Sequence, residues 1–145
     1  MALTLGLRNN NPGNIEFGAF AKRYDGTLGE GGRFARFPTM AAGIRALCEL
    51  LIVYSVQPDG KGGKINTVRE AINRWAPNNE NHTAQYIALV CSILKCSPDD
   101  EFDFNDPNFL YWMVTGIGEE ENGHAAFTEA VSDVDIDAGV AAALA

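Results

Sequence analysis

The clearest hydrophobic pattern in the chain lies between Pro38 and Val56. Its apolar positions follow one another at steps of three and four, which places them on one face of a helix. Pro38 and Thr39 suit the start of such a helix. The sequence therefore predicts an amphipathic helix through about Val56, with a buried face made of Ile44, Leu47, Cys48, Leu51 and Tyr54.

The same spacing predicts three more helices. Thr67 can cap a helix that ends at Ala76 and Pro77, and Thr83 can cap a second over residues 84–95. Asp106 is a good N-cap for a third, with Pro107 at its first position and a stop at Asn122 and Gly123. Their inward positions are predicted to be Val68, Ala71, Ile72 and Trp75, then Tyr86, Val90, Ile93 and Leu94, then Leu110, Val114 and Ile117.

The remaining segments carry weaker signals. Residues 15–17 and 33–37 alternate as short strands do, with a glycine-rich tip over residues 26–32. After Gly123 the chain turns polar and then alanine-rich, so we expect residues 136–145 to be a tail or a weak helix, with Asp137 a possible N-cap for a helix from Ala138 to Leu144. The predicted fold class is mainly α (α+β), with a small β flap near the N-terminus.

Length and composition fit one domain spanning residues 1–145. The chain has 46% hydrophobic and 21% charged residues, as expected for a globular domain with a single core. Its N-terminus lacks the basic start and apolar run of a signal peptide, and the longest apolar stretch, residues 50–54, is too short to span a bilayer. We therefore expect no membrane insertion, and folding in the cytoplasm.

Charge and cysteine spacing exclude several classes of protein. The formal charge of −8 argues against binding to nucleic acid, and it means that an anionic polymer would have to be held by hydrogen bonds and stacking. Cys48, Cys91 and Cys96 are odd in number and lack metal-type spacing. We expect reduced core thiols, no disulfide, no metal site and no cofactor.

One carboxylate continues the apolar stripe of the last strong helix. Glu121 follows Ile117 by four positions, in the last turn, where the helix dipole is negative. Apolar neighbours and the like charges of Glu119 and Glu120 also favour its protonated form, which a general acid for glycosidic cleavage requires. The alternative is a solvated run of glutamates that closes an ordinary core helix.

Residues 8–14 form a dense turn signal, because Asn and Gly tolerate left-handed backbone and Asn side chains bond to nearby amides. We expect an ordered loop. Asn11 and Asn14 could donate hydrogen bonds to the acetyl carbonyl or hydroxyls of an amino sugar. The alternative is that both residues simply hold the turn together.

Two parts of the sequence suggest a family. The segment from Ile117 to Gly123 resembles the helix end of lysozyme-like lytic transglycosylases, in which a catalytic glutamate is followed by Ser and often Gly; here Asn122 replaces Ser. The order of residues 8–15, 32–39 and 75–87 resembles phage-encoded peptidoglycan-degrading proteins and glucosaminidase-type autolysins. In those autolysins the glutamate precedes the Asn-rich segment. A circular permutation would explain the change of order, and it predicts that Glu121 meets residues 9–15 in space.

The resemblance implies a lysozyme-like fold and cleavage of the β-1,4 bond between N-acetylmuramic acid and N-acetylglucosamine, with Glu121 as general acid and base. Tyr86 would bond the reacting sugar or Glu121, and Trp75 would stack on a sugar; the alternative for both is a place in the core. Arg8 and Glu80 would brace the site as an ion pair. The partner would be a peptidoglycan glycan strand, bound by a monomer.

No second catalytic carboxylate has an obvious place, although Glu16, Asp25 and Glu30 are candidates. Its absence favours transglycosylation, in which the substrate's own hydroxyl attacks, over hydrolysis of murein or chitin. A non-catalytic virion or cell-wall-binding protein on the same fold is the rival from another class. The sequence leaves open whether the protein leaves the host cytoplasm for the cell wall at lysis or is carried in the virion.

Overall fold

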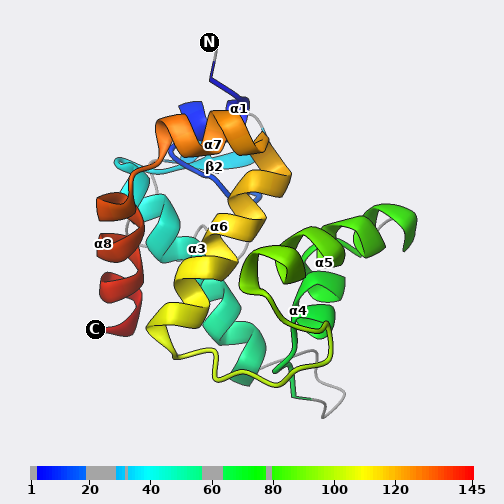
Figure 1. Ribbon diagram of the computed structural model, residues 1–145. Coiled ribbons are helices and arrows are strands. Elements are labelled where there is room, and N and C mark those ends of the chain that lie inside the picture. The colour runs from blue at the N-terminus through cyan, green and yellow to red at the C-terminus, as the bar shows by residue number, and fades with distance from the viewer. Residues whose placement is uncertain (1–2, 19–28, 32, 57–63, 78–79) are drawn as a thin grey trace.

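The computed structural model describes residues 3–18, 29–31, 33–56, 64–77 and 80–145, and of residues 29–31, 80 and 81 the backbone alone. Helices dominate these ranges, which confirms the predicted mainly helical class (Figure 1). The elements are α1 (Leu5–Arg8), β1 (Gly29–Gly31), β2 (Phe34–Arg36), α3 (Met40–Val56), α4 (Val68–Trp75), α5 (Glu80–Leu94), α6 (Pro107–Asn122), α7 (His124–Ala130) and α8 (Asp133–Leu144).

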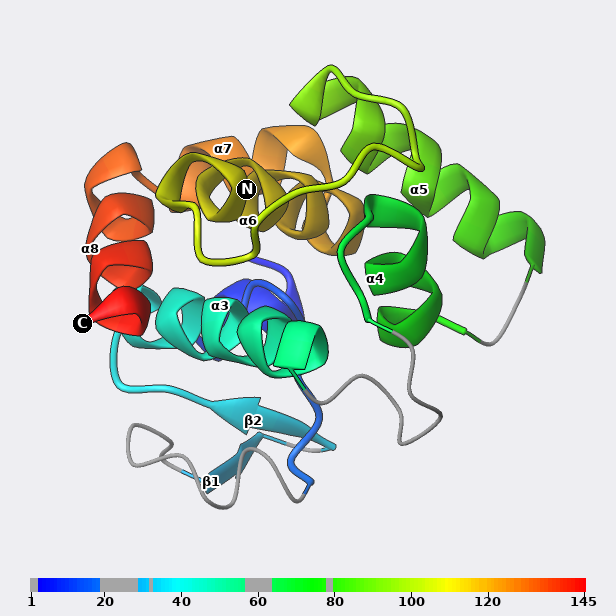
Figure 2. The same ribbon diagram turned by 90° about the horizontal axis from the view of Figure 1, so that it is seen from below.

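Helix α3 is central to the packing. Seen from below, it lies between the two-stranded sheet and α6, with α8 alongside it (Figure 2). The predicted apolar face is confirmed, since Ile44, Leu47, Cys48, Leu51 and Tyr54 are all buried. Helix α8 approaches so closely that a Cβ on Gly139 would lie 2.5 Å from the Cγ2 atom of Ile44.

Helix α6 begins and ends where its sequence signals place it. Asp106 caps the helix by accepting hydrogen bonds from the amides of Asn108 and Phe109, and Pro107 occupies the first turn. Gly123 follows the last residue with a φ of 88°, which L side chains rarely adopt. The predicted inward residues Leu110, Val114 and Ile117 are fully buried, so the stripe that leads to Glu121 faces the core.

The predicted start of α5 is wrong. The helix begins at Glu80 rather than Ala84, which places Thr83 inside the helix instead of at its N-cap. The Thr83 hydroxyl donates to the carbonyl of Ala76, at the end of α4. The Thr83 side chain, which the local sequence would assign to a helix cap, is therefore used in a contact between α5 and the end of α4.

The predicted last helix is present, but its predicted start and the polar tail expected before it are wrong. Residues after Gly123 form α7 and α8, and α8 starts at Asp133. Ser132 and Asp135 make a reciprocal capping box there, and Ile136 and Val140 are buried. Asp137 thus lies inside the helix rather than at its cap.

The β flap is present, but its strands differ from those predicted. Strand β2 pairs antiparallel with β1, with Glu30 opposite Ala35, so part of the expected glycine-rich tip is a strand. Residues 15–17 make only an isolated bridge, from Glu16 to Phe34, on the other side of β2. Most of the predicted tip and of the loop over residues 57–64 lies outside the described residues. None of the helices in the described ranges is long and apolar enough to cross a bilayer.

Candidate active site

The carboxylate of Glu121 is held at both of its oxygens. The Asn14 side-chain amide donates to Oε1 at 2.9 Å, and the Tyr86 hydroxyl donates to Oε2 at 2.9 Å. The donors come from the N-terminal loop and from α5, whereas Glu121 is in the last turn of α6. The prediction that Glu121 meets the Asn-rich loop is therefore confirmed.

The loop owes its shape to its asparagines. Asn10 and Asn14 have φ values of 53° and 52°, in the left-handed region that Asn tolerates better than most residues. The Asn11 amide donates to the carbonyls of Ile15 and Ala35, at 2.9 and 3.0 Å, and its oxygen accepts from the Ile15 amide at 2.9 Å. Asn11 is fully buried and both of its N–H groups are used, so it is a structural residue of the loop rather than the substrate ligand predicted for it.

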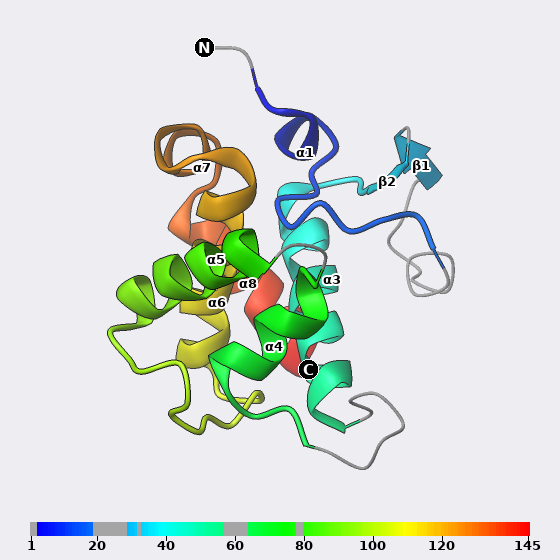
Figure 3. The ribbon, with the colours of Figure 1, turned by 90° about the vertical axis from the view of Figure 1, so that its right-hand side faces the viewer.

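Asn122 fastens this loop to the end of α6. Its amide donates to the carbonyl of Pro12 at 2.8 Å and to that of Gly118 at 2.9 Å, and its oxygen accepts from the Thr4 hydroxyl. Helix α1 thereby lies against the C-terminal end of α6 (Figure 3). The sequence indicated Asn122 as a replacement for Ser and, together with Gly123, as a helix stop, but not as a link to the N-terminal loop.

Tyr86 is fully buried, so it reaches Glu121 rather than solvent. Burial, and next the Glu121 carboxylate, raise the pKa of Tyr86 well above its ordinary value. The Trp75 side chain acts on that pKa in the opposite direction. Of the two bonding partners predicted for Tyr86, the structure places it on Glu121.

Glu121 opens on a cavity of about 610 Å³. Trp75, half-buried and edge-on to Tyr54 with ring centroids 6.2 Å apart, forms part of its wall. Stacking of Trp75 on a sugar stays a prediction. Further polar lining comes from the loop, the flap and α4, in the side chains of Asn14, Glu16, Arg33 and Arg74.

Of the candidates for a second carboxylate, Glu16 lines this cavity. It is paired with Arg33 at 3.3 Å, and both side chains are largely exposed. Asp25 lies outside the described residues, as does the side chain of Glu30. Sequence reasoning missed Arg74, which reads as a solvated residue on the polar face of α4.

The predicted brace between Arg8 and Glu80 stays untested. Arg8 is exposed and makes no ion pair with a side chain that the structure describes, whereas the side chain of Glu80 lies outside it. Within the described ranges, no three His, Cys, Asp or Glu side chains come together as metal ligands. Cys48 and Cys91 are unbonded and buried, which confirms them as core thiols.

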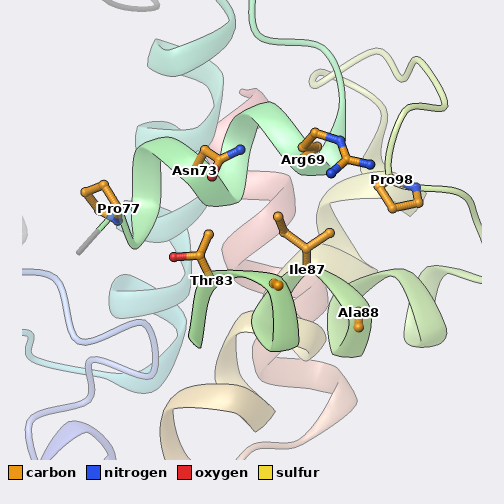
Figure 4. Close-up of a pocket in the computed structure, with 8 residues that line it drawn as sticks. Arg69, Asn73, Pro77, Thr83, Ile87, Ala88 and Pro98 are labelled. Atoms are coloured by element: carbon orange, nitrogen blue, oxygen red, sulfur yellow. The ribbon is translucent and has the colours of Figure 1, made fainter. Parts of the chain in front are cut away.

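A second cavity, of about 330 Å³, lies between α4 and α5 (Figure 4). Asn73 and Arg69 face it from α4, and Thr83 and Ile87 face it from α5. Its one charged lining residue, Arg69, is bound at two points by Asp99, at 2.8 and 3.1 Å. With no acid or base among its lining residues, this cavity offers no acid–base chemistry, whereas the wall of the Glu121 cavity carries a carboxylate and makes that cavity the candidate active site.

No protein-family model matches the chain. The sequence is similar to "Protein P5" of Pseudoalteromonas phage PM2, with 33% identity over 126 residues, which cover 85% of this chain and 74% of that protein. On this similarity, the chain belongs to the same family as Protein P5 of phage PM2.

Proposed function

We propose that this protein is a lysozyme-like enzyme that degrades peptidoglycan, cleaving the β-1,4 bond between N-acetylmuramic acid and N-acetylglucosamine as a lytic transglycosylase. The observation that carries the proposal is Glu121, a carboxylate at a cavity wall with both oxygens held by uncharged donors. Similarity to a protein of phage PM2 supports a phage origin for this enzyme. The enzyme would work as a monomer, released from the host cytoplasm at lysis or carried in the virion.

The reaction needs one group that gives and takes back a proton. Glu121, protonated, donates to the glycosidic oxygen as the bond from that oxygen to C1 of the muramic acid breaks. The C6 hydroxyl of the same sugar then attacks C1 and returns its proton to the Glu121 carboxylate. The products are a free 4-hydroxyl and a 1,6-anhydro end, and no water is consumed.

The two donors suit this cycle. A carboxylate has about four lone-pair sites, so hydrogen bonds from Asn14 and Tyr86 leave sites for the transferred proton and the substrate. Asn14 does not ionise, and the raised pKa of Tyr86 keeps its hydroxyl protonated. Glu121 is therefore the member of this trio that exchanges a proton, while the other two fix its orientation.

Hydrolysis is the second candidate, and one observation favours it. Glu16 lines the same cavity as Glu121, where it could orient a water for attack on C1. It lies 3.3 Å from Arg33, with which it forms an ion pair. In that case the protein would be a murein hydrolase or a chitinase.

Digestion of purified murein separates these reactions. Transglycosylation leaves ends that lack one water and resist borohydride reduction, whereas hydrolysis leaves reducible ends; mass spectrometry distinguishes the two. Glu121→Gln should abolish cleavage, and Glu120→Gln, one residue away, is the matched control that should retain it. Full activity of the Glu121→Gln variant would refute the proposal, and a wild-type protein that binds murein without cutting it would be a wall-binding protein.

A further inference from the structure

The charged groups around the Glu121 cavity differ in whether they have an ion-pair or hydrogen-bond partner. Glu16 and Arg33 pair with each other, and Glu121 accepts hydrogen bonds from Asn14 and Tyr86. Arg74 lines the same cavity and makes no ion pair with any carboxylate of the described ranges. In a chain of formal charge −8, an exposed guanidinium without a carboxylate partner among the described side chains is a local site for an anion.

Arg74 is held in place by Tyr54. Its guanidinium carbon lies 5.4 Å from the centre of the Tyr54 ring. Burial raises the pKa of Tyr54, and Arg74 partly offsets that rise. Contact with an aromatic ring limits the movement of the guanidinium while most of its five N–H donors stay available. A planar fork fixed in this way matches the geometry of a carboxylate.

We propose that Arg74 binds a carboxylate carried by the muramic acid residue, either its own lactyl group or one on the attached peptide. This inference rests on the proposed function for the class of sugar. The fork and the reacting carboxyl then share one cavity but bind different parts of the ligand. Arg74 therefore makes the cavity prefer muramic acid over the uncharged residues of chitin, although the protein as a whole repels anions.

Binding can be measured without turnover. The disaccharide N-acetylglucosaminyl-N-acetylmuramic acid lacks the bond that the enzyme would cut, carries a lactyl carboxylate and can be titrated into the wild-type protein by NMR. N,N′-diacetylchitobiose is the neutral comparison, and the same disaccharide with its stem peptide separates the two sources of carboxylate. We expect the muramic disaccharides to bind about three- to tenfold more tightly than chitobiose, the range of one partly exposed charge-assisted contact.

The Arg74→Gln variant should lose this preference while its affinity for chitobiose stays the same, and Arg74→Lys should keep part of it. Arg69→Gln is the matched control, because it removes an arginine from the same helix but from the other cavity. A wild-type protein without the preference, or an Arg74→Gln variant that keeps it, would overturn the inference. Equal loss of both sugars would do so too, since it would make Arg74 structural.

Failure of this inference differs from failure of the proposed function. Murein cleavage is measured separately, on the wild-type protein and its Glu121→Gln variant. If murein is not cut but the sugar preference depends on Arg74, the binding site stands and the enzymatic proposal falls. If murein is cut and Arg74→Gln keeps the preference, the reverse holds.

Discussion

Replacing Tyr86 by Phe removes one oxygen atom from the centre of the site. The Oε2 atom of Glu121 then loses the hydrogen bond that it accepts from the Tyr86 hydroxyl. A hydrogen bond to a charged group contributes about 1.5–3 kcal/mol, but Glu121 is half-exposed and cavity water can replace part of that contact. We therefore expect a loss of about 1–2 kcal/mol in the free energy of unfolding, which lowers the melting temperature of a chain of this size by about 3–6 °C.

Activity should fall through kcat. Tyr86 is fully buried, so the variant keeps its substrate contacts and its KM. What it loses is one of two donors that orient the Glu121 carboxyl, and a misdirected acid raises the barrier. A loss of about 1.4 kcal/mol at the transition state lowers kcat about tenfold.

Steady-state release of soluble fragments from murein, together with thermal unfolding, measures both effects. Tyr111→Phe is the matched control, because the Tyr111 hydroxyl also donates to a carboxylate, that of Asp133, but far from the cavity lining. It should retain full kcat. If Tyr86→Phe keeps full kcat as well, Tyr86 does not orient the acid; if KM rises about tenfold at constant kcat, Tyr86 touches the sugar instead.

Three other predictions test the framework of the site. Asn11→Ala should destabilise the fold by about 2–4 kcal/mol in urea unfolding, because three buried hydrogen bonds are lost, whereas Asn14→Ala should mainly lower kcat; the reverse order would contradict their assigned roles. Gly43→Ala would place a Cβ 1.7 Å from the Asn10 carbonyl oxygen and should cost more than about 2 kcal/mol, while Gly18→Ala, with open space around it, should cost less than about 0.5 kcal/mol. Burial, and next Glu49, raise the pKa of Cys48 from 9.0 to about 12, so the unfolded chain releases this proton first and stability should fall from pH 9 toward 12; Cys48→Ala should flatten that slope in urea titrations at pH 8 to 10.

Sequence signals that act within a few residues predicted the helix ends that depend on those residues alone. The bounds of α6 follow from Asp106, Pro107 and Gly123, and these act within a few residues of the helix ends. The start of α8 depends on the equally local capping box of Ser132 and Asp135, but the alanine-rich segment after it has no clear polar face. Its burial depends on the close approach of Gly139 to α3, which no local pattern reports.

The site could be predicted from the sequence only in part, because its contacts also join residues that are far apart in the chain. Periodicity placed Glu121 on the inward face of α6, but its contact with Asn14 came from a family resemblance, since 107 positions separate the two residues. No property of residues 8–14 shows which asparagine side chain forms hydrogen bonds with backbone groups. The Asn11 amide donates to the carbonyl of Ala35, 24 residues away, and this contact exists only in the folded chain.

The bond between Asn14 and Glu121 also sets the order of events when the chain folds. Helices α3 to α5 can form through contacts between neighbouring residues. Joining the N-terminal loop to the end of α6 closes a loop of 107 residues, and this closure costs more conformational entropy than a contact between neighbours. During synthesis the ribosome completes the N-terminal loop long before it adds Glu121. Refolding should therefore show helical circular dichroism first and muralytic activity later, and a nascent chain stopped before residue 121 would carry the orienting groups with no proton to deliver.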